Sequence, residues 1–558
     1  MHLGTSISIG GAESGEPFKH HYQPLQTMEH EDEEVPLEAL TDGPPSLDKV
    51  LHDTDKTSRV FRNLSTALAN WGIETHGSVN LNFASLLSSD PYLGGSHHIH
   101  VRRIAPVPPE ARTDVRLYQM FLVWFSANMN ILAFSTGSAG PLFFGLGARD
   151  SIVIVFLVDL IVCAIPAYFA VFGPKLGTRG MVQSRFSWGY YGSILPSVLN
   201  VFSMQGFLIL NCIIGGQTLA SVSDQLNDTL GIVIIGVISL VVTFCGYKVI
   251  HWYESIAWIP NVITFIVMLG IGGKHLHASA PPPTPATAAS VLSFVSTVAS
   301  SVISWCTMTP DYGVYHDGSA SSMRIFIYTY LGFFTSSITG HMIGAAFAAA
   351  APSVPSWTTG LGNGNDVGGL IAAILSPAGN FGKFLTAILA LSIPSACAPT
   401  MYTFSTSFMT VAPFFARIPR YVFIIISEAV LIPVAVVGAT RFYTTFVDIL
   451  SVIGYWSTAF AAIIFAEHFI FRKNKFSLYD IDDWDQPRRL PPGFAAVLAF
   501  LGAFGIIVPS MSQAWYTGPF ARAGTGDIGI ETGFIAAGLL YVCFRRVERR
   551  FYHVGRLR

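Results

Sequence analysis

Between Phe121 and Tyr541 the chain is a succession of long apolar stretches, and the lysines and arginines between them fall mostly in every second gap. A helix needs about 20 mainly apolar residues to cross the hydrocarbon core of a bilayer, and no water-soluble fold requires so many such runs. Charged residues make up only 12% of the sequence, against roughly 25% in a soluble domain. The sequence therefore predicts an all-α polytopic membrane protein with the lipid bilayer as its partner.

Twelve of these stretches are long enough to be predicted as transmembrane helices. The net charge of −2 gives no indication of nucleic acid as a partner. The predicted helices cover about 119–143, 151–172, 194–220, 230–247, 256–273, 290–309, 325–350, 381–409, 421–438, 445–470, 492–511 and 529–545.

The distribution of basic residues predicts the orientation of these helices. Cytoplasmic loops of membrane proteins carry an excess of Lys and Arg. Most of the basic residues lie in the even-numbered gaps, with Lys175, Arg179 and Arg472 among them, and in the C-terminal tail. Both termini are therefore predicted to be cytoplasmic, as an even number of crossings requires. The odd-numbered gaps hold only Arg149, Lys274, Arg441 and Arg522, with Lys383 at the edge of a predicted helix.

Three of the predicted helices contain residues that interrupt a regular helix. The first carries Asn128-Met129-Asn130, the sixth ends with Pro310 after Trp305, and the eighth contains Pro394 and Pro399. Proline removes a backbone donor, and freed carbonyls inside a bilayer need a partner such as a bound ion or substrate. Broken helices in both halves of the chain are typical of a secondary transporter with a site near the membrane midplane. A simple proline kink packed by neighbouring helices is the alternative at each position.

Nine short runs of sequence, in this order, carry a resemblance to a known family. The runs are Arg112-Thr113-Asp114, Trp124-Phe125-Ser126-Ala127-Asn128-Met129, Gly140-Pro141 with Phe144-Gly145-Leu146, Phe172-Gly173-Pro174-Lys175-Leu176-Gly177, Gly246-Tyr247-Lys248-Val249-Ile250-His251, Asp311-Tyr312 with Tyr315, Ile453-Gly454-Tyr455, Glu467-His468-Phe469 and Tyr479-Asp480-Ile481-Asp482-Asp483-Trp484-Asp485. Over about residues 102–545 the chain resembles the fungal purine–cytosine permease branch of the nucleobase–cation symporters. The resemblance implies a LeuT-like fold of two inverted five-helix repeats plus two extra helices.

The resemblance also implies the kind of substrate and the residues that hold it. Family members bind a flat heterocycle between aromatic rings, and side-chain amides contact its rim. Phe207 stands where the family usually has Trp, Asn211 keeps the amide one turn later, and Trp305 matches the second stacking aromatic. Ser126 and Asn128 match a polar cluster near the substrate. Each has a structural alternative, such as packing or an interhelical hydrogen bond.

The eighth predicted helix departs from the family pattern. The family typically carries two adjacent asparagines there, and this chain has Ala396 and Cys397 before Pro399. A site built around amides rejects analogues that lack the matching polar group, so losing both amides predicts a changed ligand. The chain is predicted to be a secondary active transporter of a purine, cytosine or a related heterocycle across the plasma membrane. A vitamin-type substrate such as pyridoxine and a transport-dead ligand sensor are the alternatives.

The resemblance implies that a co-transported proton, rather than sodium, drives transport, with Ala127 and Ser392 at the family's cation-coupling position. Titratable residues inside a membrane are functional candidates by default, and Asp159, His341, Glu428 and Asp448 lie within or near predicted helices. Glu467 and His468, beside Arg472, are expected at a cytoplasmic interface. No enzyme motif, catalytic residue, metal site or cofactor is predicted, and the oligomeric state is left open.

The chain is divided into three parts by these patterns. Residues 1–116 are predicted to be a largely disordered cytoplasmic tail, with a short amphipathic helix at 57–73. Residues 76–101 match nothing in the family pattern and are interpreted as a lineage-specific loop or an error of the gene model. Residues 117–545 form the predicted transporter domain, and 546–558 a basic cytoplasmic tail.

Overall fold

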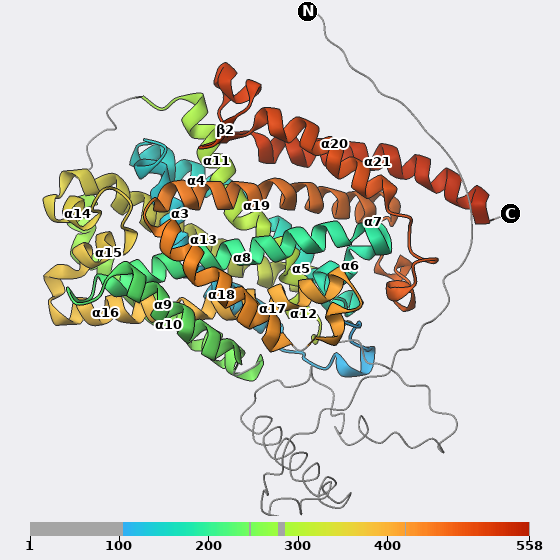
Figure 1. Cartoon of the computed structure of the whole chain (residues 1–558), viewed down its shortest axis with the longest axis horizontal. Helices are drawn as coiled ribbons and strands as arrows, with labels where there is room; N and C mark the ends of the chain where they lie inside the picture. The colour runs from blue at the N-terminus through green and yellow to red at the C-terminus, as the bar shows by residue number, and fades with distance from the viewer. Residues whose placement is uncertain (1–103, 245–246, 277–284, 419, 557–558) are drawn as a thin grey trace, which may run out of the picture. The chain divides into compact units, whose positions relative to one another are not determined.

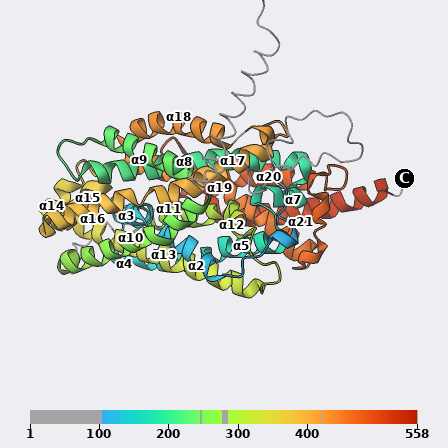
Figure 2. The same cartoon turned by 90° about the horizontal axis from the view of Figure 1, so that it is seen from below.

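The structure is a computed structural model that describes residues 104–244, 247–276, 285–418 and 420–556. Almost all of its regular structure is α-helix (Figures 1 and 2). The helix predicted at 57–73 and the insert at 76–101 lie outside the described residues. Seven helical segments of the described chain are long and apolar enough to cross a membrane: Ala148–Leu176, Ile194–Ala220, Ile256–Leu276, Ala288–Thr307, Asn380–Val411, Arg420–Ala439 and Phe442–Phe471.

Each of the twelve stretches predicted from the sequence coincides with helix. Some are formed by two consecutive helices. In chain order the structure has α2 (Tyr118–Asn128) with α3 (Ile131–Leu142), α4 (Ala148–Val162) with α5 (Ala164–Leu176), α8 (Ile194–Ala220), α9 (Asp228–Phe244), α10 (Tyr247–Leu276), α11 (Ala288–Ile303) with the 3-10 turn η3 (Ser304–Thr307) and α12 (Thr309–Gly313), α13 (Ser322–Ala350), α16 (Asn380–Leu391) with α17 (Pro394–Val411), α18 (Arg420–Ala439), α19 (Phe442–Phe465) with the π-helical turn η7 (Ala466–Phe471), α20 (Phe494–Ser510) and α21 (Gly529–Arg556).

Short elements join these helices, and the sequence patterns did not predict them. They are α6 (Gly180–Gln183), α7 (Arg185–Gly192), α14 (Pro355–Gly360), α15 (Val367–Leu375) and a two-residue hairpin of β1 (Ser512–Gln513) and β2 (Tyr516–Thr517). The hairpin strands are antiparallel, with Ser512 opposite Thr517. In both views α14 and α15 lie near α16, at the opposite end of the helices from α7. The helix α21 runs past the predicted boundary at residue 545 to Arg556.

The long helices pack in two groups. In the first, α13 contacts α2, α3, α4 and α5, and α12 contacts α5. In the second, α8 contacts α9, α17 and α18. The helix α19 contacts α8 as well as α11, and α20 packs along α21 (Figure 1). The first and second predicted stretches thus pack on α13, the sixth packs on α4 and α5 of the second, and the fourth, eighth and ninth pack on α8.

Glycines allow α3 and α13 to touch backbone to backbone. A Cβ atom at Gly137 of α3 would lie 1.8 Å from the carbonyl oxygen of His341 in α13. A Cβ at Gly344 of α13 would lie 1.9 Å from the carbonyl oxygen of Phe134. Small residues at such crossings let membrane helices approach closely, where van der Waals packing replaces the missing hydrophobic driving force.

The outer surface carries rows of large apolar side chains. On α10, Ile256, Ile259, Ile263 and Ile266 are all exposed and recur at helical spacing. Water-soluble monomers rarely expose contiguous apolar surface of this extent. Rows of this kind therefore agree with helices that face acyl chains rather than water.

The end of α19 holds a buried ionic cluster. The side chain of Glu467 is 2% exposed, and its oxygens lie 3.1 Å from Nε of Arg472 and 3.2 Å from Nε of Arg545. The hydroxyl of Tyr541 donates to the same carboxylate at 3.0 Å. The neighbouring His468 is also buried and lies 3.0 Å from the hydroxyl of Tyr168. Glu467 and His468 are therefore buried within the protein at the end of α19, and their position at the cytoplasmic interface stays a prediction.

Candidate functional site

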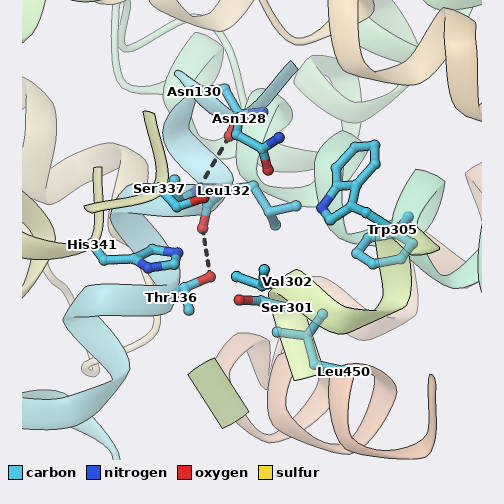
Figure 3. Close-up of a pocket in the computed structure, with 12 residues that line it drawn as sticks. Asn128, Asn130, Leu132, Thr136, Ser301, Val302, Trp305, Ser337, His341 and Leu450 are labelled. Atoms are coloured by element: carbon cyan, nitrogen blue, oxygen red, sulfur yellow. Dashed lines mark hydrogen bonds between the residues drawn. The ribbon is translucent and has the colours of Figure 1, made fainter. Parts of the chain in front are cut away.

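A small cavity lies where the break in the first helix meets α8, η3, α13 and α19. Its volume is about 20 Å³, which is enough for roughly one water molecule. Figure 3 shows Trp305 and His341 on opposite sides of this space, with Asn128 at its edge. A heterocycle therefore requires the cavity to widen. The lining residues are Asn128, Asn130, Leu132, Ala133, Thr136, Phe207, Ser301, Val302, Trp305, Ser337, His341 and Leu450.

Two predicted stacking residues, Phe207 and Trp305, share this cavity and touch each other. Their ring centroids are 5.7 Å apart and the ring planes are inclined by 31°. A flat guest between two parallel rings needs a separation of about 7 Å, because each stacked contact takes about 3.5 Å. The rings therefore occupy the space that a guest between them would fill. Both side chains are buried, so Trp305 is not a residue of the membrane interface.

Trp124 extends the aromatic wall behind Trp305. Its ring stacks on Phe333 at 4.8 Å and meets Trp305 edge-on at 5.7 Å and Tyr312 edge-on at 5.2 Å. The indole nitrogen of Trp124 has no hydrogen-bond partner among the described residues. Trp124 belongs to one of the motifs that carry the family resemblance, but nothing in the sequence placed it beside Trp305, since the two are far apart in the chain.

Asparagine side chains satisfy the backbone at the break between α2 and α3. Nδ2 of Asn130 donates to the carbonyl of Ala127 at 2.6 Å, and its Oδ1 accepts from the backbone N–H of Ala133. Nδ2 of Asn128 donates to the carbonyl of Trp124 at 3.0 Å. From α10, Nδ2 of Asn261 donates to the carbonyl of Met129 at 2.6 Å. These bonds satisfy backbone groups at the helix break beside the cavity, as non-helical backbone inside a bilayer requires.

Two other predicted substrate residues are buried near the cavity without lining it. Asn211 lies one turn beyond Phe207 on α8, and its Nδ2 donates to the Phe207 carbonyl at 2.9 Å. Its Oδ1 and the hydroxyl of Ser126 have no partner among the described residues. Unsatisfied buried polar atoms are costly, and both atoms keep an open capacity for hydrogen bonding. Their contact with substrate stays a prediction.

The remaining predicted positions lie around the eighth stretch. Ala396 and Cys397 are fully buried on α17, and neither lines the cavity. Ser392 lies at the break between α16 and α17, where its hydroxyl donates to the carbonyl of Leu389 at 2.7 Å. The helices α2 and α17 are in contact. A cation site formed by Ala127 and Ser392 stays a prediction.

The four titratable candidates have different surroundings. Nδ1 of His341 lies 2.9 Å from Oδ2 of Asp159, and His341 lines the cavity. Glu428 lies against Gly236 of α9 and does not line the cavity, and neither of its oxygens has a partner among the described residues. Asp448 accepts from the backbone N–H of Ala514 at 3.3 Å. Only the pair of His341 and Asp159 therefore reaches the cavity.

Hydrogen bonds join the two groups of helices on both sides of the cavity. On the side of α3, the hydroxyls of Ser138 and Tyr443 are 2.8 Å apart. On the side of α12, Asp311 accepts from the backbone N–H of Gly180 at 2.7 Å and from the hydroxyl of Thr406 at 3.3 Å. These bonds join the group of helices around α13 to α19 and α17. Hydrogen bonds therefore bridge the two helix groups on both sides of the cavity in this conformation.

Sequence comparison relates the chain to a family of membrane permeases. The family described as "Permease for cytosine/purines, uracil, thiamine, allantoin" matches residues 106–517. The purine–cytosine permease fcyB of Emericella nidulans is 35% identical, over 82% of this chain and 91% of its own. The vitamin B6 transporter TPN1 of Saccharomyces cerevisiae is 25% identical, over 84% and 90% of the two chains.

Among solved structures, Mhp1 in a closed conformation with bromovinylhydantoin bound superposes with a TM-score of 0.63. It is a nucleobase–cation symport family transporter, 18% identical over 80% of this chain and 95% of its own. That likeness concerns the fold, which is LeuT-like, and agrees with the broken first and sixth stretches. The extent of the family match and the identity to fcyB settle the assignment. The chain is a multi-pass membrane transporter, not an enzyme, and it belongs to the purine–cytosine permease family.

Proposed function

We propose that this transporter takes up a nucleobase-like planar heterocycle across the plasma membrane, driven by a co-transported proton and by alternating access. The observation that carries the proposal is the cavity in which Phe207, Trp305 and the amide of Asn128 meet. Two aromatic faces grip a flat ring, and an amide can both donate to and accept from its rim. The chemistry of the wall supports this substrate class.

We also propose the topology that this mechanism needs. Twelve helices cross the bilayer, the first ten form two inverted repeats of five, and α20 and α21 are added. The breaks in the first and sixth stretches and the two packing groups around α13 and α8 support this arrangement. Both termini, including the tails at 1–116 and 546–558, are cytoplasmic, as the basic residues of the even-numbered gaps predict.

A vitamin-type heterocycle such as pyridoxine is the second candidate. The observation in its favour is the apolar pair of Ala396 and Cys397 on α17, where the family pattern has amides. A pocket without those amides has less to offer the polar edge of a purine or cytosine. A curated relative that transports vitamin B6 shows that related proteins accept such a ligand.

Uptake in cells that lack their own nucleobase and vitamin permeases tests the proposal. Labelled cytosine, purine bases and pyridoxine are offered at several external pH values, with and without a protonophore. We expect saturable uptake of one of these compounds that weakens as external pH rises and collapses with the protonophore. Uptake that follows sodium would replace the proton as the coupling ion. Binding without uptake, by protein at the cell surface, would identify a sensor instead.

Replacing Trp305 by alanine should raise KM for the transported compound by about 5-fold to 150-fold, because base–aromatic stacking contributes roughly 1–3 kcal/mol. Trp305→Phe should recover most of the affinity, since it restores a stacking face. Trp515→Ala removes an indole that is 63% exposed and should leave KM unchanged. Uptake kinetics normalised to surface protein provide the measurement. An unaltered KM in Trp305→Ala would remove this ring from the binding site.

Introducing the family's amides at Ala396 and Cys397 should improve affinity for cytosine relative to pyridoxine. The double variant Ala396→Asn with Cys397→Asn supplies donors and acceptors for a polar rim. The double variant with leucine at both positions adds similar volume without polar atoms, and it should not gain affinity. Competition of each unlabelled ligand against uptake measures the change. Equal behaviour of the two double variants would mean that these positions do not face the substrate.

A further inference from the structure

A buried acid–base pair joins α4 and α13 beside the cavity. Nδ1 of His341 lies 2.9 Å from Oδ2 of Asp159, and the side chains are 3% and 0% exposed. A carboxylate can only accept, so Nδ1 of His341 carries the hydrogen of this bond. The neutral ring then has its lone pair on Nε2. Among the residues that the structure describes, Nε2 has no hydrogen-bond partner, and His341 lines the cavity wall.

Within the part of the chain that the structure describes, His341 is the basic group that pairs with Asp159. Its second oxygen, Oδ1, has no partner among the described residues. The titratable groups that interact electrostatically with Asp159 include the thiol of Cys163 at the start of α5 and the phenol of Tyr330 on α13. Tyr330 donates its hydroxyl to the carbonyl of Leu160 at 2.8 Å. From the other helices packed there, α3 presents Thr136 and α11 presents Ser301, which do not titrate.

We propose that His341 and Asp159 together form the proton-binding site that couples ion movement to transport. This inference rests on the proposed proton symport and names its carrier. One proton from the outer solution adds to Nε2 of the neutral imidazole, and no other bond forms or breaks. The resulting imidazolium is balanced by the Asp159 carboxylate. The same proton leaves Nε2 to the cytoplasm when the cavity opens on that side.

The charge of the pair explains how binding and closure are linked. Without the added proton the pair carries one net negative charge, whose burial in a low-dielectric interior is costly. With the added proton the pair is neutral, and both ring nitrogens of His341 can donate a hydrogen bond. A closed cavity around the pair is then stabilised. Because His341 faces the same small space as Trp305 and Asn128, a substrate that fills the cavity shields the pair from water (Figure 3). Proton and substrate therefore favour the same closed conformation.

Reconstitution into proteoliposomes separates the coupled from the uncoupled activity. With an imposed proton gradient, the wild type should concentrate the labelled substrate, and Asp159→Asn and His341→Gln should bring the inside-to-outside ratio to unity. Exchange of labelled for unlabelled substrate at equal concentrations needs no net proton movement, and Asp159→Asn, whose side chain does not line the cavity, should retain it. A variant that still concentrates substrate with the wild-type pH profile would overturn the proposal.

A second measurement works without a substrate and keeps the proposal separate from the function on which it rests. Infrared difference spectra of the purified protein across pH should show an imidazole and carboxylate contribution that is lost in both His341→Gln and Asp159→Asn. Its presence with no transported compound would leave the proton site standing while the proposed function fails. Its absence in the wild type would overturn the proton site.

Glu428 provides the matched control because it is also a buried carboxylate within a predicted helix. It lies against Gly236 of α9 and does not line the cavity. Glu428→Gln should therefore keep both proton-driven accumulation and the pH-dependent infrared contribution. Loss of accumulation in Glu428→Gln, with accumulation retained in Asp159→Asn, would transfer the coupling role to α18 and refute the assignment to His341.

Discussion

Gly137→Ala is expected to cost about 3 kcal/mol or more of folding free energy, above the usual range for overpacking. The added Cβ would lie 1.8 Å from the carbonyl oxygen and 2.5 Å from the carbonyl carbon of His341. These are backbone atoms, so no side-chain rotation relieves the clash. The helices α3 and α13 would have to separate, and the packing along their whole contact would loosen. We expect little folded protein at the cell surface and a strongly reduced melting temperature in detergent.

Gly505→Ala is the control for that experiment. Gly505 lies within α20, and a Cβ there meets nothing within 4 Å. Alanine also has the higher helix propensity, so the control should be neutral or slightly stabilising. Melting followed by size-exclusion chromatography of the two variants gives the comparison. Equal melting temperatures would show that the close contact of α3 and α13 is not required for the fold.

The second large effect is expected at Glu467. Replacing this carboxylate by glutamine removes the counter-charge that the guanidinium groups of Arg472 and Arg545 share, and leaves Arg545 with Glu548 as its remaining carboxylate partner. Removing one partner of a buried ion pair typically costs about 3–5 kcal/mol, mostly because the remaining charge stays desolvated. Tyr541 would also lose a charged acceptor for its hydroxyl, which lies 3.0 Å from Oε2. The loss should appear as unfolding at lower denaturing-detergent concentration.

The pair of Asp483 and Arg489 is a suitable comparison for Glu467. Its atoms are 3.2 Å apart, but the side chain of Arg489 is 59% exposed. Exposed ion pairs contribute about 0–1 kcal/mol, so Asp483→Asn should change stability little. If Glu467→Gln and Asp483→Asn unfold alike, the cluster at the end of α19 contributes no more than a surface pair.

The helices were predictable because their signal is local. Twenty consecutive apolar residues can be recognised in the sequence without knowing their neighbours, and asparagine or proline marks a break in the same way. The breaks at Asn130 and before Pro394 illustrate this. The short helices α14 and α15 were missed because a nine-residue apolar run such as Val367–Leu375 is below the length of a membrane crossing.

The site was less predictable, since it depends on contacts between distant segments. The positions of Phe207 and Trp305 came from the family resemblance, and no periodic pattern joins them. The burial of Glu467 could not be foreseen, because its partner Arg545 lies 78 residues later. Likewise, nothing in the sequence paired His341 with Asp159, which are 182 residues apart.

Several motifs that carry the resemblance belong to the scaffold instead of the cavity. Nη1 of Arg112 donates to the carbonyl of Pro174 at 3.0 Å. Nζ of Lys175 donates to the carbonyls of Gly318 and Ala320 at 3.0 and 2.6 Å. These bonds fasten the segment before α2 and the loop after α12 to the end of α5. A sequence motif in this family can therefore report on how the helices are tied together as well as on what they bind.

The direct contact of Phe207 and Trp305 has a consequence for ligand selectivity. Because the two rings touch, the space between them has no fixed dimensions in the empty protein. The shape of the empty form therefore does not predict which ligands fit best. Affinity will instead depend on the free energy needed to separate the two rings, offset by the stacking and hydrogen bonding that each ligand gains. Thick or puckered molecules would then be rejected because they require the rings to separate further, even when their polar groups match.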